Sequence, residues 1–240
     1  VMLLGQNVNS YGKNLETPMS FAELLREVEK VEGIERIRFM TSHPKDLSDE
    51  LIEVMKNSKK ICRHLHLPMQ SGSTEILRRM NRKYTKDDYL ALVDKIKTAM
   101  PEISLTTDII VGFPTETEED FLQTIELVDR VKFSDIHPFP FSPRSGTVAY
   151  KMKDLPAEIK KQRLAVLIEK KEKCKTDFIN SMKGKVLDFL FEELKDGYYQ
   201  GYSENYLRIY LKEFNPDGNI KKVKVIERFL DGALCELQGE

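Results

Sequence analysis

The sequence predicts an α/β protein in which a parallel, barrel-like sheet with outer helices is followed by a small antiparallel β-barrel. Three observations lead to this fold class. Short apolar, β-branched segments alternate with helical patterns along the first part of the chain, a long helix follows, and the remaining segments alternate with period two. A chain of 240 residues is long enough for one large domain and a small second one.

Five apolar segments are predicted to be parallel strands, because a helical pattern separates each from the next. They are VMLLGQNV from Val1, IRFMTS from Ile37, HLHLPMQ from His64, SLTTDIIVGFP from Ser104 and SDIHPFPFS from Ser134. Strand–helix–strand units place their strands in one sheet, either as a barrel or as an open doubly wound sheet. No strand is followed by G-x-G-x-x-G, which disfavours the dinucleotide-binding form of the open sheet.

The helices between these strands have clear start signals. Three match the capping-box pattern, in which a hydroxyl residue is followed three positions later by an acidic residue. These pairs are Ser20–Glu23, Thr85–Asp88 and Thr117–Asp120. Ser48 is predicted to cap a further helix, and Pro156 to begin a long one that ends at Gly184.

The segments after Lys185 are predicted to form antiparallel hairpins. Their turns are Asp196-Gly197 and the Pro-Asp-Gly sequence at 216–218, both of which have suitable turn chemistry. A small β-barrel is the commonest compact shape for this many short strands. We therefore divide the chain into residues 1–183, the parallel barrel with its last helix, and residues 184–240, the β domain.

Composition excludes some classes of protein. The net charge of −1 gives no overall basic field, although a local basic patch would suffice for a nucleic-acid partner. No apolar run is long enough to span a bilayer, so a cytoplasmic protein without a membrane partner is expected. The three cysteines, Cys62, Cys174 and Cys235, lie far apart and match neither a disulfide framework nor a metal-binding spacing.

The predicted strands end in polar or glycine-rich clusters. These clusters are residues 5–7, 41–44, 68–73, 112–116 and 142–146. Because the carboxyl ends of parallel barrel strands share one face, the five clusters are expected to converge on one rim, where such folds hold their active sites. The four histidines, His43, His64, His66 and His137, lack a third ligand at a recognisable spacing, so no metal site is predicted.

Six ordered motifs carry a family resemblance that runs along nearly the whole chain. They are LLGQNVNSYG, RIRFMTSHPKDLSDELIEVM, HLHLPMQSGS, MNRKYT, TTDIIVGFPTETEEDF and FSPRSGT. Together they resemble the radical-SAM tRNA methylthiotransferases of the MiaB/MtaB type. The resemblance implies a partial radical-SAM (TIM-like) barrel, from its second strand onward, followed by a TRAM-like domain for tRNA binding.

The resemblance also implies a reaction. Such enzymes add a methylthio group to carbon-2 of a modified adenosine beside the tRNA anticodon, using S-adenosylmethionine and two four-iron four-sulfur clusters. The implied partners are the tRNA anticodon stem-loop, S-adenosylmethionine and an electron donor that the sequence does not identify. The cysteines that hold these clusters in the family are absent from this sequence. The chain is therefore expected to ligate neither cluster and to be inactive by itself, and its catalytic residues are not predicted.

The family's binding residues can be assigned to positions of this sequence. For S-adenosylmethionine the resemblance implies Gly5, Gln6, Asn7, Ser42, Gln70, Ser71, Asp108, Ile110 and Arg144. Thr115 stands where the family more commonly has glycine. Candidate RNA-binding residues are Lys170 and Lys173 on the long helix, together with Tyr202, Asn205 and Arg208 on the aromatic-rich hairpin.

Several alternatives remain open at the level of sequence. The motifs LLGQNVNSYG and TSHP favour an isopentenyladenosine substrate, whereas FSPRSGTVAYKM and GYSENYLRIYL favour a threonylcarbamoyladenosine one. The relative that modifies a ribosomal protein fits less well. An RNA-binding module without catalysis and an unrelated TIM-barrel lyase are further possibilities, although a lyase would be expected to carry a lysine at a strand end.

Overall fold

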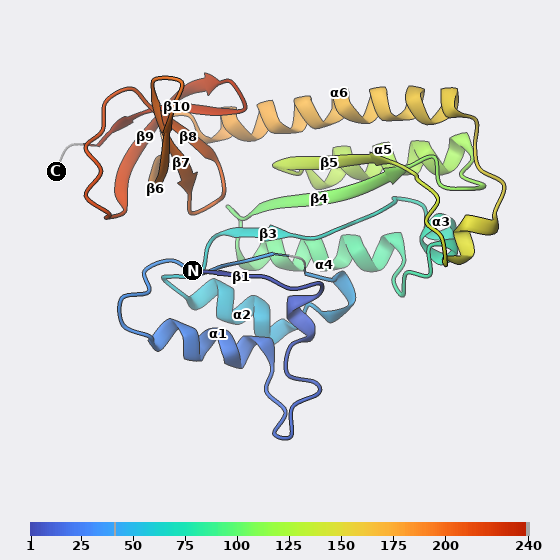
Figure 1. Ribbon diagram of the computed structural model, residues 1–240, viewed down its shortest axis with the longest axis horizontal. Coiled ribbons are helices and arrows are strands. Elements are labelled where there is room, and N and C mark those ends of the chain that lie inside the picture. Colours follow the sequence, from blue (N-terminus) through green and yellow to red (C-terminus); the bar gives the residue numbers. More distant parts are fainter. Residues whose placement is uncertain (41, 239–240) are drawn as a thin grey trace.

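The computed structural model describes residues 1–40 and 42–238, which form a layered α/β part followed by a small β-barrel (Figure 1). The α/β part contains all five predicted strands in the predicted order. They are β1 (Met2–Leu3), β2 (Arg38–Phe39), β3 (His64–His66), β4 (Ser104–Val111) and β5 (Asp135–Pro140). The hydrogen-bonded strands are shorter than the apolar segments that predicted them.

All pairings among these strands are parallel. β1 pairs with β2, and β3, β4 and β5 form a second sheet in that order. An isolated parallel bridge between Ile37 and Ile61 links the two sheets, so the five strands follow one another in sequence order. This arrangement confirms the predicted partial parallel barrel.

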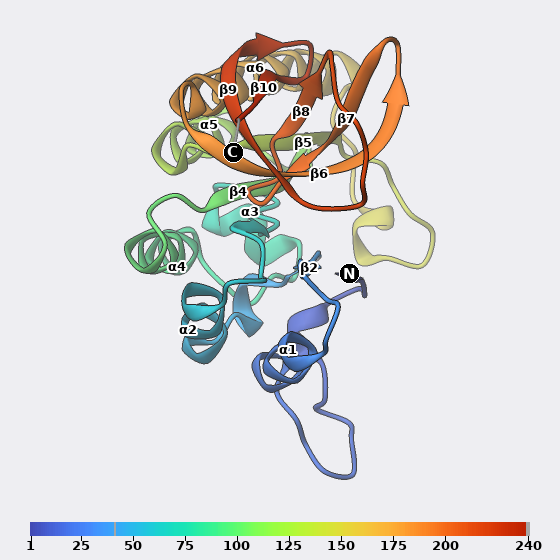
Figure 2. The ribbon, with the colours of Figure 1, turned by 90° about the vertical axis from the view of Figure 1, so that its left-hand side faces the viewer.

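Helices cover one side of these strands. The α-helices are α1 (Phe21–Lys30), α2 (Asp49–Asn57), α3 (Thr74–Arg79), α4 (Lys86–Ala99), α5 (Glu118–Val131) and α6 (Ala157–Met182). The short 3₁₀ helices are η1 (Val8–Ser10), η2 (Pro44–Asp46) and η3 (Val148–Lys151). Figure 2 looks along the strands and shows α1, α2, α4, α5 and α6 in an arc. Within the described residues, no helix combines the length and apolar character needed to cross a membrane.

The two faces of the strands differ in burial. In β4 the side chains of Leu105, Thr107 and Ile109 are buried beneath the helices, whereas Asp108 and Ile110 are partly exposed on the other face. That second face is the inner face of the barrel, the one turned away from the helices. Side chains at every second strand position therefore reach it, which decides which residues can form a site there.

The predicted capping signals are present. Ser20, Thr85 and Thr117 each accept a hydrogen bond from the backbone three residues on, and the acidic partner of each pair closes the capping box. Ser48 caps α2 with its side chain. The sequence analysis did not predict α3, whose six residues are too few to show a helical period, although Ser73 caps it in the same way.

The strands of the small barrel are β6 (Val186–Lys195), β7 (Tyr198–Ser203), β8 (Arg208–Leu211), β9 (Lys221–Phe229) and β10 (Gly232–Leu237). They close in the order β10-β8-β7-β6-β9 around a core of their own, which includes Phe189 and Ile209. The prediction of antiparallel hairpins throughout is wrong in one respect. β8 pairs with β10 in parallel and does not pair with β9, so the turn at 216–218 joins strands that are not hydrogen-bonded neighbours.

The small barrel contacts the amino-terminal ends of the parallel strands. Arg36 donates hydrogen bonds to the carbonyl oxygens of Tyr202 and Asp188, at 2.9 Å each, and Arg38 donates to that of Ser203 at 3.1 Å. Figure 1 shows the barrel at the opposite end of the sheet from α3, which follows the carboxyl end of β3. The small barrel and the predicted cofactor rim therefore lie at opposite ends of the strands.

Candidate functional site

A cavity of about 740 Å³ opens at the carboxyl ends of β4 and β5. Gln70, Asp108 and Ile110 contribute from the strand ends, and Phe113, Phe139 and Phe141 contribute an aromatic surface. The volume lies within the range of sites for small organic ligands. Three predicted cofactor residues therefore line one cavity beside aromatic side chains on which a planar ring can stack.

Backbone hydrogen bonds fix the position of Gln70. Its N–H donates to the carbonyl oxygen of Asp108 at 2.8 Å, and its own carbonyl accepts from Ile110 N at 2.9 Å. Gln70 has a left-handed φ of 67°, which turns the chain away from β4 after this pair of bonds. The turn holds the Gln70 backbone at the strand end beside Asp108.

Arginines give the edge of the cavity a positive character. Arg144, the fourth predicted cofactor residue at this cavity, follows β5 and is exposed. Arg79 is the last residue of α3, and Arg82 follows that helix. Arg79 donates to Glu75 at 2.6 Å and to the hydroxyl of Thr115. The buried Nε of Arg82 has no hydrogen-bond partner among the residues that the structure describes. Guanidinium groups in this setting suit a carboxylate or phosphate.

A buried ion pair shapes the loop between β4 and α5. The Glu116 carboxylate accepts from Gly112 N and from Arg163 Nη1 of α6, at 2.7 Å each. Burial raises the pKa of Glu116, and the hydrogen bonds from Gly112 and Arg163 oppose that rise. The pair ties α6 to the loop that carries Phe113, one of the aromatic residues of the cavity.

The predicted residues after β1 and β2 do not line this cavity. Gly5 and Gln6 are exposed, and Asn7 donates from Nδ2 to Asp46 Oδ2 at 2.7 Å. Ser42 is buried, and its hydroxyl has no hydrogen-bond partner within residues 1–40 and 42–238. None of these four residues lines the cavity at β4 and β5. Their role in cofactor binding stays a prediction.

Ser71 lies in the packing between α3 and α5. Its side chain is completely buried, and its hydroxyl lies 3.5 Å from that of Thr124 and accepts from Ser73 N at 3.2 Å. These bonds hold the start of α3 against α5. The Ser71 hydroxyl is thus engaged in contacts within the protein, and its role in cofactor binding stays a prediction.

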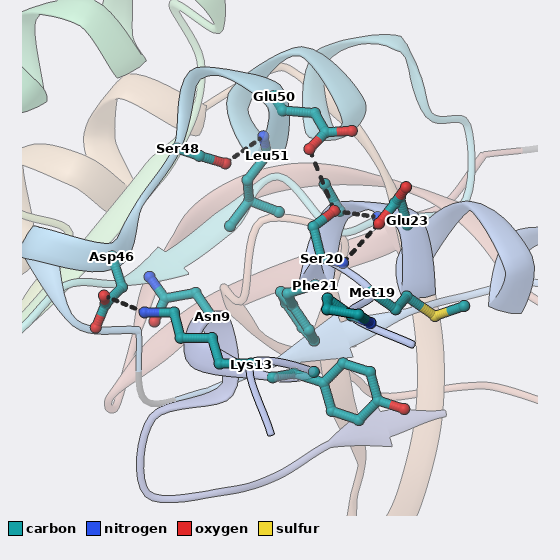
Figure 3. A pocket seen from close by; sticks show the side chains of 14 residues that line it. Asn9, Lys13, Met19, Ser20, Phe21, Glu23, Asp46, Ser48, Glu50 and Leu51 are labelled. Carbon is teal, nitrogen blue, oxygen red and sulfur yellow. Dashed lines mark hydrogen bonds and ion pairs between the residues drawn. The ribbon is translucent and has the colours of Figure 1, made fainter. Parts of the chain in front are cut away.

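A second cavity of about 410 Å³ lies between the loop after β1 and helices α1 and α2 (Figure 3). Its polar side chains bind one another. Lys13 pairs with Asp46 at 2.8 Å, and Ser20 forms the capping box with Glu23. The hydrogen bond from Lys13 is the main reason that the pKa of Asp46 falls below its usual range. These contacts hold the loop against α1 and α2, and they leave fewer polar groups free to bind a ligand than the first cavity has.

The candidate RNA-binding residues are engaged in intramolecular contacts. Lys170 pairs with Asp129 and Lys173 with Asp177, while Arg208 donates to Gln200 at 2.8 Å and lies over the Tyr202 ring. These groups are at least partly exposed, and their RNA role stays a prediction.

Asn205, a further candidate RNA-binding residue, is mostly buried. Its amide is buried, accepts from the Ser203 hydroxyl at 2.6 Å and donates to the Met182 sulfur. The side chain therefore stabilises the β7–β8 turn, and its role in RNA binding stays a prediction.

One cluster is not visible in the sequence pattern. His66, Asp108 and His137 come from three adjacent strands and meet on the inner face of the barrel, and theirs is the only such group of three potential metal ligands within the described residues. Their positions are 42 and 29 residues apart in the chain, so no local motif reveals them. Period-two alternation along the strands was the one available signal.

The cysteines do not form a comparable group. Cys62 follows the bridge between β2 and β3, Cys174 lies in α6, and Cys235 is in the core of the small barrel. No two of them share an element of secondary structure. The three thiols therefore do not fit a four-iron four-sulfur cluster, because such a cluster requires several cysteines close together.

Parallel strands with helices on one side and a ligand-sized cavity at their carboxyl ends define an α/β barrel of the cofactor-binding kind. The Radical SAM superfamily matches residues 2–128, more than half of the chain. The chain therefore belongs to the radical SAM superfamily, and the resemblance found in the sequence is confirmed.

Curated relatives are highly similar. The tRNA-2-methylthio-N(6)-dimethylallyladenosine synthase of Lachnoclostridium phytofermentans is 59% identical over 197 residues, which are 82% of this chain and 43% of the relative. The synthase of the same name from Acetivibrio thermocellus is 56% identical over 193 residues, or 80% of this chain and 40% of the relative. The chain thus spans about two fifths of the length of these relatives.

Among solved structures, coproporphyrinogen III oxidase from Escherichia coli, described as a radical SAM enzyme, matches 64% of this chain and 36% of its own. Its sequence identity is 21% and the TM-score is 0.49.

Proposed function

We propose that this chain is part of a tRNA methylthiotransferase that modifies carbon-2 of dimethylallyladenosine next to the anticodon. The observation that carries this proposal is the 59% identity, over 82% of the chain, to a relative named tRNA-2-methylthio-N(6)-dimethylallyladenosine synthase. The second relative, at 56% identity, has the same name. Such an enzyme would act in the cytoplasm, where it meets tRNA.

The cavity at β4 and β5 is the proposed site for S-adenosylmethionine. Its residues fit that molecule: the Phe113 and Phe141 rings suit the adenine, Gln70 and Asp108 suit the ribose hydroxyls or the amino group, and Arg144 suits the carboxylate. Arg82 also lines the cavity and adds positive charge to its edge. When bound to an iron–sulfur cluster, S-adenosylmethionine supplies radical chemistry in this superfamily.

The work of this chain's own residues is to bind, orient and shield. The ion pair between Glu116 and Arg163 fixes the loop that carries Phe113, and the hydrogen bonds of Gln70 fix the strand end beside Asp108. Rigid positioning and exclusion of water protect a reactive intermediate from side reactions. Because the thiols of this chain do not fit a cluster, we assign no catalytic step to them.

We propose the anticodon stem-loop as the RNA partner and the small barrel as a TRAM-like RNA-binding domain. Tyr202 and Arg208 lie close together on its strands, and aromatic and arginine side chains are suited to contact bases and phosphates. The small barrel and the cavity lie at opposite ends of the sheet, so an RNA that contacts both must extend along the strands.

The names of the relatives favour dimethylallyladenosine over threonylcarbamoyladenosine. The test compares binding of three anticodon stem-loops, which carry dimethylallyladenosine, threonylcarbamoyladenosine or unmodified adenosine, by fluorescence anisotropy. Tightest binding of the dimethylallyl form supports the proposal, and preference for the threonylcarbamoyl form overturns the substrate assignment. Equal binding of all three would leave an RNA-binding module without recognition of the modified base.

A matched pair of variants tests the cofactor site. Equilibrium dialysis with S-adenosylmethionine should show weaker binding by Arg144→Ala, because a charge-assisted contact is lost. Arg130→Ala, which removes an exposed arginine of α5 outside the cavity, should bind like the unchanged chain. Unchanged binding by Arg144→Ala would remove this residue from the site.

A further inference from the structure

Three side chains with metal-binding chemistry meet on the inner face of the barrel. His66 of β3, Asp108 of β4 and His137 of β5 each offer one ligand atom, and these atoms all lie within 4.8 Å of one another. Nε2 of His66 is 3.5 Å from Oδ2 of Asp108, and the two imidazole ring centres are 5.7 Å apart. Such separations can close onto one ion with small side-chain rotations, since metal–ligand bonds are about 2 Å long.

The pairing of the strands produces this cluster. Asp108 lies directly opposite His137 in the β4–β5 pair, and His66 lies opposite Thr106, two positions before Asp108, in the β3–β4 pair. Side chains two positions apart on a strand share a face, and directly opposed residues lie within contact distance. The cluster is therefore built on three hydrogen-bonded strands, which hold their side chains more firmly than loops would.

Thr106 orients the most deeply buried of the three residues. Its hydroxyl lies 3.0 Å from Nδ1 of His66 and 2.9 Å from Nε2 of His64. With Nδ1 of His66 held in this way, Nε2 is directed towards Asp108. A hydrogen bond to the non-ligating ring nitrogen is the usual support of a metal-bound histidine. His64 takes no part as a ligand, because its ring packs against Tyr206, 4.6 Å between centres.

The ion pairs around the cluster leave the Asp108 carboxylate available to bind a cation. The nearby carboxylate of Asp135 is paired with Lys175 at 3.2 Å and with Lys171 at 3.7 Å. Among the described residues, the one ion pair of Asp108 is that with His66. Two imidazoles and a carboxylate thus face one another, and among the described residues no lysine or arginine forms an ion pair with that carboxylate.

We propose that His66, Asp108 and His137 bind a divalent transition-metal ion of the kind represented by Zn²⁺, Fe²⁺ and Co²⁺. Imidazole nitrogens with one carboxylate oxygen suit these ions, whereas Mg²⁺ and Ca²⁺ prefer oxygen ligands alone. Three protein ligands leave coordination positions open. Asp108 also lines the cavity with Gln70, so an ion here lies next to the bound ligand of that cavity. The proposal goes beyond the proposed function and does not depend on it.

The test uses the whole chain after removal of metal with a chelator. Zn²⁺ is titrated against a chromophoric competitor, and Co²⁺ is followed by its visible absorption. We expect one ion per chain, with Co²⁺ bands typical of nitrogen and oxygen ligands. Asp108→Asn and His137→Ala should each weaken binding at least tenfold. The matched control is His43→Ala, a histidine whose ring accepts from Lys45 N outside the cluster, and it should bind like the unchanged chain.

Three outcomes would overturn the proposal. The first is absence of stoichiometric binding by the unchanged chain. The second is binding by Asp108→Asn and His137→Ala that is as tight as that of the unchanged chain. The third is a Co²⁺ spectrum dominated by thiolate charge transfer, which would move the ion to a cysteine. His137 is exposed, so its replacement by alanine should leave the fold intact, as circular dichroism can verify. Loss of binding by a folded His137→Ala chain supports the site. None of these results bears on the recognition of RNA.

Discussion

The guanidinium carbon of Arg38 lies 4.1 Å from the centre of the Tyr206 ring. These two residues belong to different parts of the protein: Arg38 is in β2 of the parallel sheet, and Tyr206 is in the β7–β8 turn of the small barrel. The same ring also lies 4.6 Å from the ring of His64 and stacks on that of Tyr202 at 4.6 Å. Tyr206 thus contacts residues of both parts of the protein.

Replacement of Tyr206 by alanine should weaken the coupling between the two parts, although the hydrogen bonds from Arg36 and Arg38 to the small barrel remain. The change removes one cation–π contact and two ring contacts, each of which contributes about 1 kcal/mol. Urea unfolding followed by circular dichroism should therefore show a loss of about 1–3 kcal/mol and a broader transition as the two cores begin to unfold separately. Tyr206→Phe keeps the ring and should retain most of the stability.

The control for this comparison is Tyr150→Ala, which removes a tyrosine that is 56% exposed. If Tyr206→Ala unfolds at the same urea concentration and with the same sharpness as Tyr150→Ala, the Tyr206 ring does not couple the two parts.

Replacement of Arg163 by methionine should destabilise the protein in a pH-dependent way. The change leaves the buried Glu116 carboxylate without its cation, at a cost of about 3–5 kcal/mol. Burial already raises the pKa of Glu116 above its ordinary 4.5, and loss of Arg163 raises it further. An acid whose pKa is higher in the folded state gives stability that is full below the unfolded pKa and falls as the pH rises through the folded one. The deficit should be larger at pH 7 than at pH 5.

The matched double variant tests the cause of that deficit. Arg163→Met with Glu116→Gln removes the buried charge together with its partner and should recover part of the lost stability, with little dependence on pH. Urea unfolding at both pH values measures all three chains. A deficit of Arg163→Met that is the same at pH 5 and pH 7 would show that packing of the arginine, and not its charge, is what matters.

Local signals predicted the local structure well. The capping residues Ser20, Thr85 and Thr117 act within one turn of their helices, so a few neighbouring letters are enough to place each start. The order of the parallel strands followed in the same way from alternation with helices. The pairing of β8 with β10 could not be predicted, because it depends on closure of a barrel by residues 24 positions apart, such as Ile209 and Ala233.

In the candidate site too, the features that follow from local sequence were predicted, and those that depend on tertiary packing were not. Gln70 follows β3, Asp108 and Ile110 lie near the carboxyl end of β4, and the structure places all three in one cavity. Ser71 was assigned through the family resemblance and Asn205 from its place on the aromatic-rich hairpin, and the structure shows both side chains buried, which the sequence did not indicate. His137 was noted without a partner, because only the register of β4 against β5 brings it to Asp108. Which side of a turn a residue faces is decided by tertiary packing, which the sequence does not show directly.

Replacement of Gly72 by alanine should disturb the turn that carries Gln70. A Cβ atom at Gly72 would lie 2.5 Å from Cα of Thr124 and 2.7 Å from the carbonyl oxygen of Gln123, both in the backbone of α5. The helix or the turn must move, so we expect a loss of about 2 kcal/mol in unfolding free energy. The control is Gly5→Ala, whose Cβ would meet one side-chain atom of Val8 at 3.3 Å. Equal stability of the two variants in urea would show that α5 yields freely.

Anaerobic reconstitution of this chain with iron and sulfide should produce no four-iron cluster. The thiolate form of cysteine is the cluster ligand, and burial raises the pKa of Cys62 and of Cys174 and raises that of Cys235 to about 12. The thiols also lie on separate elements of the fold. We expect no brown absorption beyond that of a control in which all three cysteines are serine, and no release of 5′-deoxyadenosine from S-adenosylmethionine. Four iron and four sulfide ions per chain, lost in the serine control, would contradict both the expectation and the separation of the thiols on which it rests.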